Sequence, residues 1–289
     1  MDNILFFDVP KEYDGVLCKI FLKKHCKISA RLITKLVRTE MGITRDGKII
    51  RTIDSVHFGD KIEIKLPSDN NDIEPVMGEL DIKFEDSHIL VVNKPPNMPV
   101  HPTKNHQRDT LANIVRHYAL SKGEDYTFRT INRIDRDTSG LVIIAKDRFT
   151  ANGLKGLYKE YTAVCQGNIV EDGTVDKNIR LKPDSKMVRE VNENGARAVT
   201  HYFVLSKNID YSLVRCVLET GRTHQIRCHM SYLGYPLAGD DLYGGKTDKI
   251  HRQALHCSYL RFIHPVTKQI IEIMSELPED MNSLLNIDS

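Results

Sequence analysis

The hydrophobic and polar positions of this 289-residue chain predict more strands than helices. Short apolar or alternating runs that end at turn residues predict strands at 80–86, 88–94, 141–145, 161–167, 199–205, 211–219, 254–262 and 268–274. Apolar residues recur with helical spacing at 109–121, 149–158, 223–233 and 278–286. Because the strands rarely alternate with helices one for one, we expect an α+β fold with a mixed, mainly antiparallel central sheet and flanking helices.

The first 70 residues predict a small unit of their own. Helical spacing of apolar residues at 16–24 and 30–38 is followed by short strand candidates at 43–44, 48–52 and 61–66. The polar, turn-rich stretch from Pro67 to Pro75 predicts a domain boundary. We therefore expect a small α+β domain at 1–70, a linker at 71–79 and the main domain at 80–289.

The charge is distributed unevenly along the chain, although its net value at pH 7 is only +2. Between Leu17 and Arg51 there are ten lysines and arginines and two acidic residues, whereas the rest of the chain is acidic on balance. A basic block next to a body with net negative charge is typical of a small domain that binds polyanions. We therefore predict polyanion contacts for the cations of its two helices: Lys19, Lys23, Lys24, Lys27, Arg31, Lys35 and Arg38.

The composition is that of an ordinary globular protein, with 40% hydrophobic and 28% charged residues. No apolar run approaches the roughly 18 to 20 residues that a membrane-spanning helix needs. The first ten residues, MDNILFFDVP, lack the basic start of a signal peptide, and the six cysteines form no C-x-x-C pair. We therefore expect reduced thiols, a cytoplasmic protein without membrane contact, and a monomer as the default.

A dense charged stretch, from Asn132 to Gly140, stands directly before the apolar run LVIIA. Its Asp135 lies between Arg133 and Arg136, whose positive charges favour the ionised carboxylate at neutral pH. A carboxylate on a loop that a buried strand holds in place can act as a nucleophile at a sugar carbon or as a base. A purely structural charged loop is the alternative at this point.

A second polar stretch, 218–230, runs from a predicted strand into a predicted helix. Near the helix start it carries Arg222, His224, Arg227 and His229. Arginines and helix N-termini both attract anions, so a phosphate or a carboxylate is the natural partner of this stretch. His224 and Cys228 have the i, i+4 spacing of metal ligands, but no second pair stands nearby in the sequence, so we predict no metal site.

Tyr161 opens the predicted strand 161–167. A tyrosine in this position is usually packed in the core or at a sheet edge. Beside a basic cleft its ring could instead stack on a nucleobase, an interaction worth roughly 1–3 kcal/mol per base.

Four segments taken together resemble the pseudouridine synthases of the RluA/RluC/RluD family. They are Glu85–Pro102, Asn132–Gly140 with the apolar run after it, Lys159–Val164 and Gly221–Arg227. The resemblance covers residues 80–275, and the first 70 residues resemble the S4-type RNA-binding domain that often precedes this body. It implies the pseudouridine synthase fold with an N-terminal S4-like domain, structured RNA as the partner, and neither a cofactor nor a metal.

The resemblance also implies roles by position. Asp135 matches the aspartate that initiates cleavage of the uridine glycosidic bond, and Arg222 matches the arginine that pairs with it. Tyr161 matches the tyrosine that stacks on the target uracil and is implicated in proton removal from C5. Arg133 matches a residue that contacts RNA near the extruded nucleotide, and Ile226 an apolar residue of the pocket wall.

Two positions depart from the family pattern. Asn132 stands where the family often has histidine, and Asn97 stands where a glycine usually follows the Lys-Pro pair. If the histidine makes only loop hydrogen bonds or RNA contacts, asparagine can replace it in part; if it tunes the aspartate, the activity falls. Because the aspartate, tyrosine and arginine positions are retained, we expect an active enzyme.

The resulting hypothesis is an RNA pseudouridine synthase, an isomerase that converts specific uridines of structured RNA to pseudouridine through Asp135. The layout suggests large-subunit ribosomal RNA as the substrate, and transfer RNA remains open. The main alternative is a non-catalytic S4-type RNA-binding or ribosome-assembly factor. A carboxylate-dependent glycosidase would usually need a second acid at a fixed distance, and Asp137 is poorly placed to serve.

Overall fold

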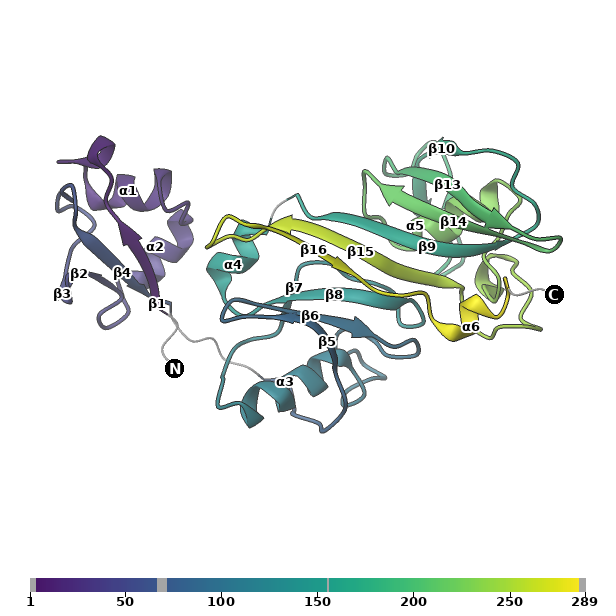
Figure 1. The fold of residues 1–289 in the computed structure, drawn as a ribbon, viewed down its shortest axis with the longest axis horizontal. Coiled ribbons are helices and arrows are strands. Elements are labelled where there is room, and N and C mark those ends of the chain that lie inside the picture. The colour runs from purple at the N-terminus through teal and green to yellow at the C-terminus, as the bar shows by residue number, and fades with distance from the viewer. Residues whose placement is uncertain (1–3, 67–71, 155, 286–289) are drawn as a thin grey trace.

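The computed structural model describes residues 4–66, 72–154 and 156–285. Within these ranges the chain forms a long sheet that dominates the body of the molecule and a four-stranded sheet near its N-terminus (Figure 1). Helices are few and flank the sheets, which confirms the predicted α+β class.

The long sheet has ten strands among the described residues, and their spatial order departs from the order in the sequence. From edge to edge its main path is β10 (Gly173–Asp176), β13 (Val199–Lys207), β14 (Tyr211–Leu218), β9 (Tyr158–Gln166), β15 (Leu255–Ile263), β8 (Ser139–Ala145), β6 (Ile89–Lys94) and β5 (Asp81–Glu85). β16 (Ile270–Met274) also pairs with β15, and β7 (Arg129–Thr130) also pairs with β8. Its ladders are antiparallel except that of β15 with β8, so the prediction of a mixed, mainly antiparallel sheet is confirmed.

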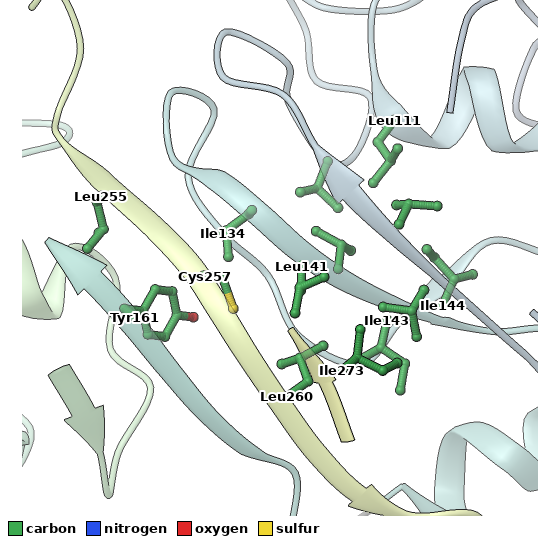
Figure 2. Close-up of a cluster of buried hydrophobic side chains, with 14 of the residues drawn as sticks. Leu111, Ile134, Leu141, Ile143, Ile144, Tyr161, Leu255, Cys257, Leu260 and Ile273 are labelled. Carbon is green, nitrogen blue, oxygen red and sulfur yellow. The ribbon is translucent and has the colours of Figure 1, made fainter. Parts of the chain in front are cut away.

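The middle of the long sheet is buried because its strands carry almost uninterrupted apolar sequence. All seven residues of β8 are buried, as are five of the six residues of β6. Their side chains form one hydrophobic cluster with β9 and β15, which includes Ile134, Tyr161, Leu255 and Cys257 (Figure 2). Tyr161 and the residue before Asp135 therefore belong to the rigid core.

The helices of the body lie around this sheet. α3 (Leu111–Ser121) packs its apolar face on the core and begins with a capping box of Thr110 and Asn113. The other elements are α4 (Arg148–Gly153), α5 (Gln225–Tyr232), α6 (Glu279–Asn282), the 3-10 turn η2 (Asp241–Tyr243) and the separate strand pair β11 (Ile179–Leu181) and β12 (Arg189–Val191). Within the described ranges, no helix has the length and apolar composition that a membrane span requires.

Some predicted elements differ from those observed. The helix predicted at 149–158 is too long, because α4 ends at Gly153, Gly156 turns the chain with a φ of +76° and Tyr158 already begins β9. The helix predicted at 278–286 is reduced to the short α6, and residue 286 lies outside the described residues. The strands β1, β7 and β10–β12 had no predicted counterpart.

The N-terminal unit joins two helices to the four-stranded sheet. Its strands are ordered β1 (Ile4–Asp8), β4 (Lys61–Lys65), β2 (Ile43–Arg45) and β3 (Lys48–Ile49). The two helices are α1 (Cys18–Lys24) and α2 (Ala30–Leu36), and the 3-10 turn η1 (Lys11–Tyr13) precedes them. The rings of Phe7 and Phe149 meet edge to face with centroids 6.0 Å apart, so the unit also contacts α4. The division into domains at 1–70, 71–79 and 80–289 stays a prediction, since residues 67–71 lie outside the described part.

The sheet order brings together segments that are far apart in the sequence. Ser139 of β8 pairs with His256 of β15, and Cys257 of β15 pairs with Tyr161 of β9. The next strand, β14, leads into α5. The loop before β8, the side chain of Tyr161 and the start of α5 therefore meet in one region of the molecule.

Candidate active site

The loop between β7 and β8 is held by hydrogen bonds to its backbone. Nζ of Lys94, at the end of β6, donates to the carbonyl of Arg136 at 2.9 Å and to that of Pro95 at 2.7 Å. The backbone N–H of Met98 donates to the same Arg136 carbonyl at 3.1 Å. Burial lowers the pKa of Lys94 to about 7. Because the carbonyl next to Asp135 is fixed from two sides, the carboxylate projects from a defined position.

Structural reasons account for both departures from the family pattern. Asn132 is buried and joins the loop to β8, because its Nδ2 donates to the carbonyl of Leu141 and its Oδ1 accepts from the N–H of Ile143, both at 2.9 Å. Asn97 has a φ of 57°, in the left-handed region that asparagine tolerates better than most residues with a side chain. Asparagine thus supplies loop hydrogen bonds at one position and replaces glycine at little cost at the other.

The carboxylate of Asp135 is paired with Arg227 of α5. Nη1 of Arg227 lies 3.2 Å from Oδ2 of Asp135, while its Nε and Nη2 each donate to an oxygen of Asp240 at 2.7 Å. The Asp240 side chain is fully buried, whereas that of Asp135 is 30% exposed. Burial acts to lower the pKa of Arg227, but its bonds to the two carboxylates outweigh burial and raise that pKa. Arg227 is therefore a permanent cation, oriented by Asp240 and directed at Asp135.

The prediction that Arg222 pairs with Asp135 is corrected by this geometry. Nε of Arg222 donates to the backbone carbonyl of Arg197 at 3.1 Å, and its side chain lies exposed at the rim of the site. Both arginines belong to Gly-Arg-Thr-His-Gln-Ile-Arg, but Arg222 precedes the helix and Arg227 lies in its first turn. His224 and Arg227, which both approach Oδ2 of Asp135, stand three residues apart in this motif.

Tyr161 places a neutral phenol in the same site. Its side chain is 6% exposed, and its hydroxyl points toward Cys257 of β15 (Figure 2). Burial raises the pKa of Tyr161 well above its ordinary value, and the nearby Cys257 and Asp135 act in the same direction. The phenol therefore keeps its proton at neutral pH.

Two adjoining hollows lie over these residues. The inner hollow, of about 60 Å³, contains Asp135 and Tyr161 and has apolar walls from Ile134, Leu218, Ile226 and Leu255. The outer hollow, of about 390 Å³, shares Asp135, Tyr161 and the cations Arg133 and Arg222 with the inner one and adds Lys159. Apolar walls beside one carboxylate and several cations suit a flat, uncharged ring that is attached to an anionic backbone.

Sequence reasoning named His224 only as part of an anion-attracting stretch and missed Asp240 and Tyr243. Nε2 of His224 lies 3.7 Å from Oδ2 of Asp135, and its Nδ1 lies 3.0 Å from the hydroxyl of Tyr243. Asp240 and Tyr243 stand in the segment after α5, which carried no recognised motif. Among the described residues, no group of three or more His, Cys, Asp or Glu side chains could hold a metal ion.

The predicted polyanion contacts of the N-terminal helices are exposed, apart from the half-buried Lys35. Three of them lie on α1 and one follows it: Lys19, Lys23, Lys24 and Lys27. The others, Arg31, Lys35 and Arg38, line a cleft of about 760 Å³ whose opposite side includes Arg129 and Arg148 of the body. Burial lowers the pKa of Lys35, and the positive charges of Arg148 and Arg129 act in the same direction. The cleft therefore gathers positive charge from both sides.

Comparison with known proteins places this site in a family. Residues 88–232 match the family model described as RNA pseudouridylate synthase. The uncharacterized RNA pseudouridine synthase YjbO of Bacillus subtilis (strain 168) is 41% identical over 286 residues, which cover 95% of this chain and 97% of that protein. The ribosomal large subunit pseudouridine synthase D of Buchnera aphidicola subsp. Baizongia pistaciae (strain Bp) is 36% identical over 300 residues, which cover 94% of this chain and 91% of that protein.

Solved structures agree with the sequence comparison. Human RNA Pseudouridylate Synthase Domain Containing 1 is similar with a TM-score of 0.58 and 26% identity, covering 72% of this chain and 86% of that chain. Human RNA Pseudouridylate Synthase Domain Containing 4 gives a TM-score of 0.55 and 25% identity, covering 70% and 90%. The segment that matches the family model contains Asp135, Tyr161, His224 and Arg227.

Proposed function

Because the chain belongs to the RNA pseudouridylate synthase family and is an RNA pseudouridine synthase, we propose that its substrate is one or more uridines of large-subunit ribosomal RNA. The choice of RNA is supported by similarity to a ribosomal large subunit pseudouridine synthase D across 94% of this chain. The observation that carries the catalytic assignment is the pairing of Asp135 with Arg227 at an apolar pocket. We further propose that the enzyme acts as a cytoplasmic monomer.

Asp135 is the proposed reactive group. Pseudouridine formation moves the bond at C1′ of the ribose from N1 to C5 of the uracil. Asp135, ionised and oriented by Arg227, either attacks C1′ and displaces N1 or removes a proton from the sugar so that uracil leaves. The freed uracil rotates in the pocket and its C5 bonds to C1′, while the Asp135–C1′ bond breaks in the first route or the proton returns to the sugar in the second. The C5 hydrogen then leaves as a proton, and N1 takes up a proton. No atom is gained or lost, and the apolar walls keep the free base from escaping.

Tyr161 and Ile226 are the proposed contacts of the target base. A protonated phenol offers its ring face for stacking on uracil, and burial of Tyr161 keeps it in this form. Ile226, which is 3% exposed, closes the pocket from α5. These contacts offset the few kcal/mol that extrusion of a uridine from its stack costs.

The cations that line the hollows, together with those of the N-terminal helices, are the proposed contacts of the RNA backbone. Arg133 and Arg222 line both hollows, and their charges can attract the phosphates that flank an extruded nucleotide. Farther away, the cations on and beside α1 and α2 add attraction that does not depend on the RNA sequence: Lys19, Lys23, Lys24, Lys27, Arg31, Lys35 and Arg38.

The first prediction is that Asp135→Asn abolishes pseudouridine formation without loss of RNA binding. By analogy with the removal of other nucleophiles, we expect the single-turnover rate constant to fall by roughly 10⁴-fold or more. The measurement is a map of pseudouridine in all RNAs of cells that lack the gene, with the gene restored as wild type or as Asp135→Asn. Asp137→Asn is a matched control, because Asp137 lies in the same loop but pairs with Arg136.

We expect pseudouridines in large-subunit ribosomal RNA to be lost when the gene is deleted. They should return only when the wild type or the Asp137→Asn control is restored. Loss confined to transfer RNA would overturn the proposed substrate and leave the activity intact. Restoration by Asp135→Asn would overturn the role of the aspartate.

A further inference from the structure

Tyr243, at the end of η2, is a buried residue that contacts both partners of the Asp135 carboxylate. Its ring lies under the guanidinium of Arg227, with Cζ 5.0 Å from the ring centroid. It also meets the ring of His224 edge to face, with an interplanar angle of 84°. Its hydroxyl oxygen lies 3.0 Å from Nδ1 of His224 and accepts the backbone N–H of Arg189 at 2.8 Å. One side chain thus supports Arg227 by its face and His224 by its hydroxyl.

The hydrogen bonds of this hydroxyl determine where the proton of His224 lies. The N–H of Arg189 can only donate, so it occupies a lone pair of the phenol oxygen and leaves the phenol hydrogen for another partner. Among the described contacts of this hydroxyl, Nδ1 of His224 is the group that can accept that hydrogen. Burial raises the pKa of Tyr243 to about 12, so the phenol keeps its hydrogen at neutral pH. Nδ1 is then an acceptor, and the proton of a neutral imidazole lies on Nε2.

The Nε2 side of His224 faces the catalytic carboxylate. It lies 3.7 Å from Oδ2 of Asp135, the oxygen that Nη1 of Arg227 also approaches at 3.2 Å. An Nε2 lone pair would repel this carboxylate, whereas an Nε2–H is attracted to it. Both donors therefore face Oδ2, and no hydrogen bond between described residues occupies Oδ1. Oδ1 is left for the uridine.

The charged groups around His224 favour its neutral form overall. Asp135 and Asp240 face the imidazole and act to raise its pKa, while Arg227 and Arg189 act to lower it. Burial is the largest influence, and the pKa of His224 is lowered. A neutral ring adds no full positive charge beside Asp135, so its N–H weakens the carboxylate as a nucleophile less than an imidazolium would.

The backbone of His224 is held in an uncommon conformation. It precedes α5 with φ 56° and ψ 24°, in the left-handed region, and its side chain makes no capping bond to the helix. Such strain persists where the surroundings fix the residue, and it is concentrated at functional sites. Here the conformation directs the imidazole between Tyr243 and Asp135 instead of toward the first turn of α5.

We propose that His224 is a hydrogen-bond donor in the uridine pocket, that Tyr243 fixes it as the Nε2–H tautomer, and that Tyr243 is thereby a positioning residue for the reaction. The proposal rests on the proposed function and adds two residues to it. His224 donates from Nε2 toward Asp135 and the bound sugar. Tyr243 acts through His224 and Arg227 and does not touch the RNA.

The tautomer can be measured on the full-length protein without any activity. Two-dimensional ¹H–¹⁵N NMR of histidine-labelled protein distinguishes a protonated from an unprotonated ring nitrogen, and the spectrum of His224→Gln assigns the signal. We expect Nδ1 unprotonated and Nε2 protonated at pH 7.5 in the wild type, and a mixture of tautomers in Tyr243→Phe. A proton on Nδ1 in the wild type, or an unchanged tautomer in Tyr243→Phe, would overturn the proposal.

A double-mutant cycle tests the consequence for catalysis. Tyr243→Phe keeps the ring under Arg227 and removes only the hydroxyl, so we expect a roughly tenfold lower single-turnover rate constant with RNA affinity unchanged within about twofold. His224→Gln places an amide N–H near the position of Nε2, and this donor does not need the hydroxyl. In the His224→Gln background, Tyr243→Phe should therefore change the rate constant by less than twofold.

The two kinds of failure are distinguishable. If Tyr243→Phe lowers the rate constant equally in both backgrounds, its hydroxyl acts on the fold through Arg189 and the proposal is overturned. If wild-type protein forms no pseudouridine in the ribosomal RNA while the NMR result is as expected, the substrate assignment fails and the tautomer assignment stands.

Discussion

At the scale of single residues, Lys94 places its terminal amino group where water does not reach it. Burial lowers its pKa to about 7, from 10.5 for an ordinary lysine. Between these values the unfolded chain binds more protons than the folded chain, so the stability that this group contributes rises with pH. We expect the free energy of unfolding of the wild type, relative to Lys94→Met, to rise from pH 7 to pH 9 by up to roughly 1.4 kcal/mol per pH unit.

Urea denaturation at several pH values measures this difference. Lys48→Met serves as the control, because the side chain of Lys48 is exposed to water in the folded protein. A constant difference in stability between the wild type and Lys94→Met across this range would contradict the inference that the folded protein holds Lys94 as a neutral amine.

From the sequence, the types of residue in the site could be predicted better than the individual residues that lie there. Asp135 was chosen over Asp137 by its position in the motif Asn132–Gly140, and Tyr161 is the single tyrosine of Lys159–Val164. Arg222 was chosen over Arg227 because the motif contains both, and only the start of α5 at Gln225 decides which side chain turns inward. Tyr243 could not be predicted, since its contacts with His224 and Arg227 come from the way the segment after α5 folds back.

At the scale of elements, β8 begins where it passes closest to β15. Gly140 has a φ of +113°, and a Cβ there would lie 2.4 Å from the carbonyl oxygen of Cys257 and 2.5 Å from its nitrogen. Both are backbone atoms, so the clash can be relieved only by moving β8 away from β15. We expect Gly140→Ala to lower the free energy of unfolding by roughly 2–5 kcal/mol, from overpacking and backbone strain together.

Chemical denaturation measures this loss, and Gly47→Ala separates its two causes. Gly47 has a φ of +76°, but a Cβ there would meet no atom within 4 Å. Its substitution should cost only about 1 kcal/mol from the backbone conformation. Equal losses for the two variants would show that the close approach of β8 to β15 contributes nothing.

The elements that sequence patterns predicted correctly are those whose burial is local and regular. β6 and β8 are nearly continuous apolar runs, and α3 has a clear helical period. β1 was missed because its assignment depends on pairing with β4, more than fifty residues later. The helix predicted in place of α4 was too long because the apolar spacing continues past Gly153 and into the start of β9.

At the scale of the whole molecule, the exposed lysines of α1 lie apart from the catalytic pocket. We expect the triple variant Lys19→Gln, Lys23→Gln and Lys24→Gln to bind an rRNA fragment more weakly and to reduce the slope of log K against log[salt] by up to about 2–3. The single-turnover rate constant at saturating RNA should stay unchanged. Fluorescence titrations between 50 and 200 mM salt measure the slope.

A second triple variant is the control for net charge. Lys83, Lys122 and Lys207 lie outside the N-terminal unit, so their replacement by glutamine removes the same charge from other surfaces. An equal reduction of the slope in both variants would contradict a specific role for α1.

The α+β class and the mainly antiparallel sheet could be predicted, but the neighbours within the sheet could not. Alternating polarity identifies strands without indicating their partners. The position of β15 between β9 and β8 depends on side chains from three distant segments packing together, including Tyr161, Cys257 and Ile134 (Figure 2).

The central position of β15 also orders events during synthesis of the chain. The N-terminal sheet is complete once residue 65 has been made, whereas β9 and β8 gain their common neighbour only with residues 255–263. Until then the pocket lacks the part of its wall that Leu255 forms. A nascent chain can therefore expose the helices that we propose to bind RNA long before it can modify RNA. On that proposal, the enzyme acquires attraction for its substrate and the ability to react with it at separate stages of translation.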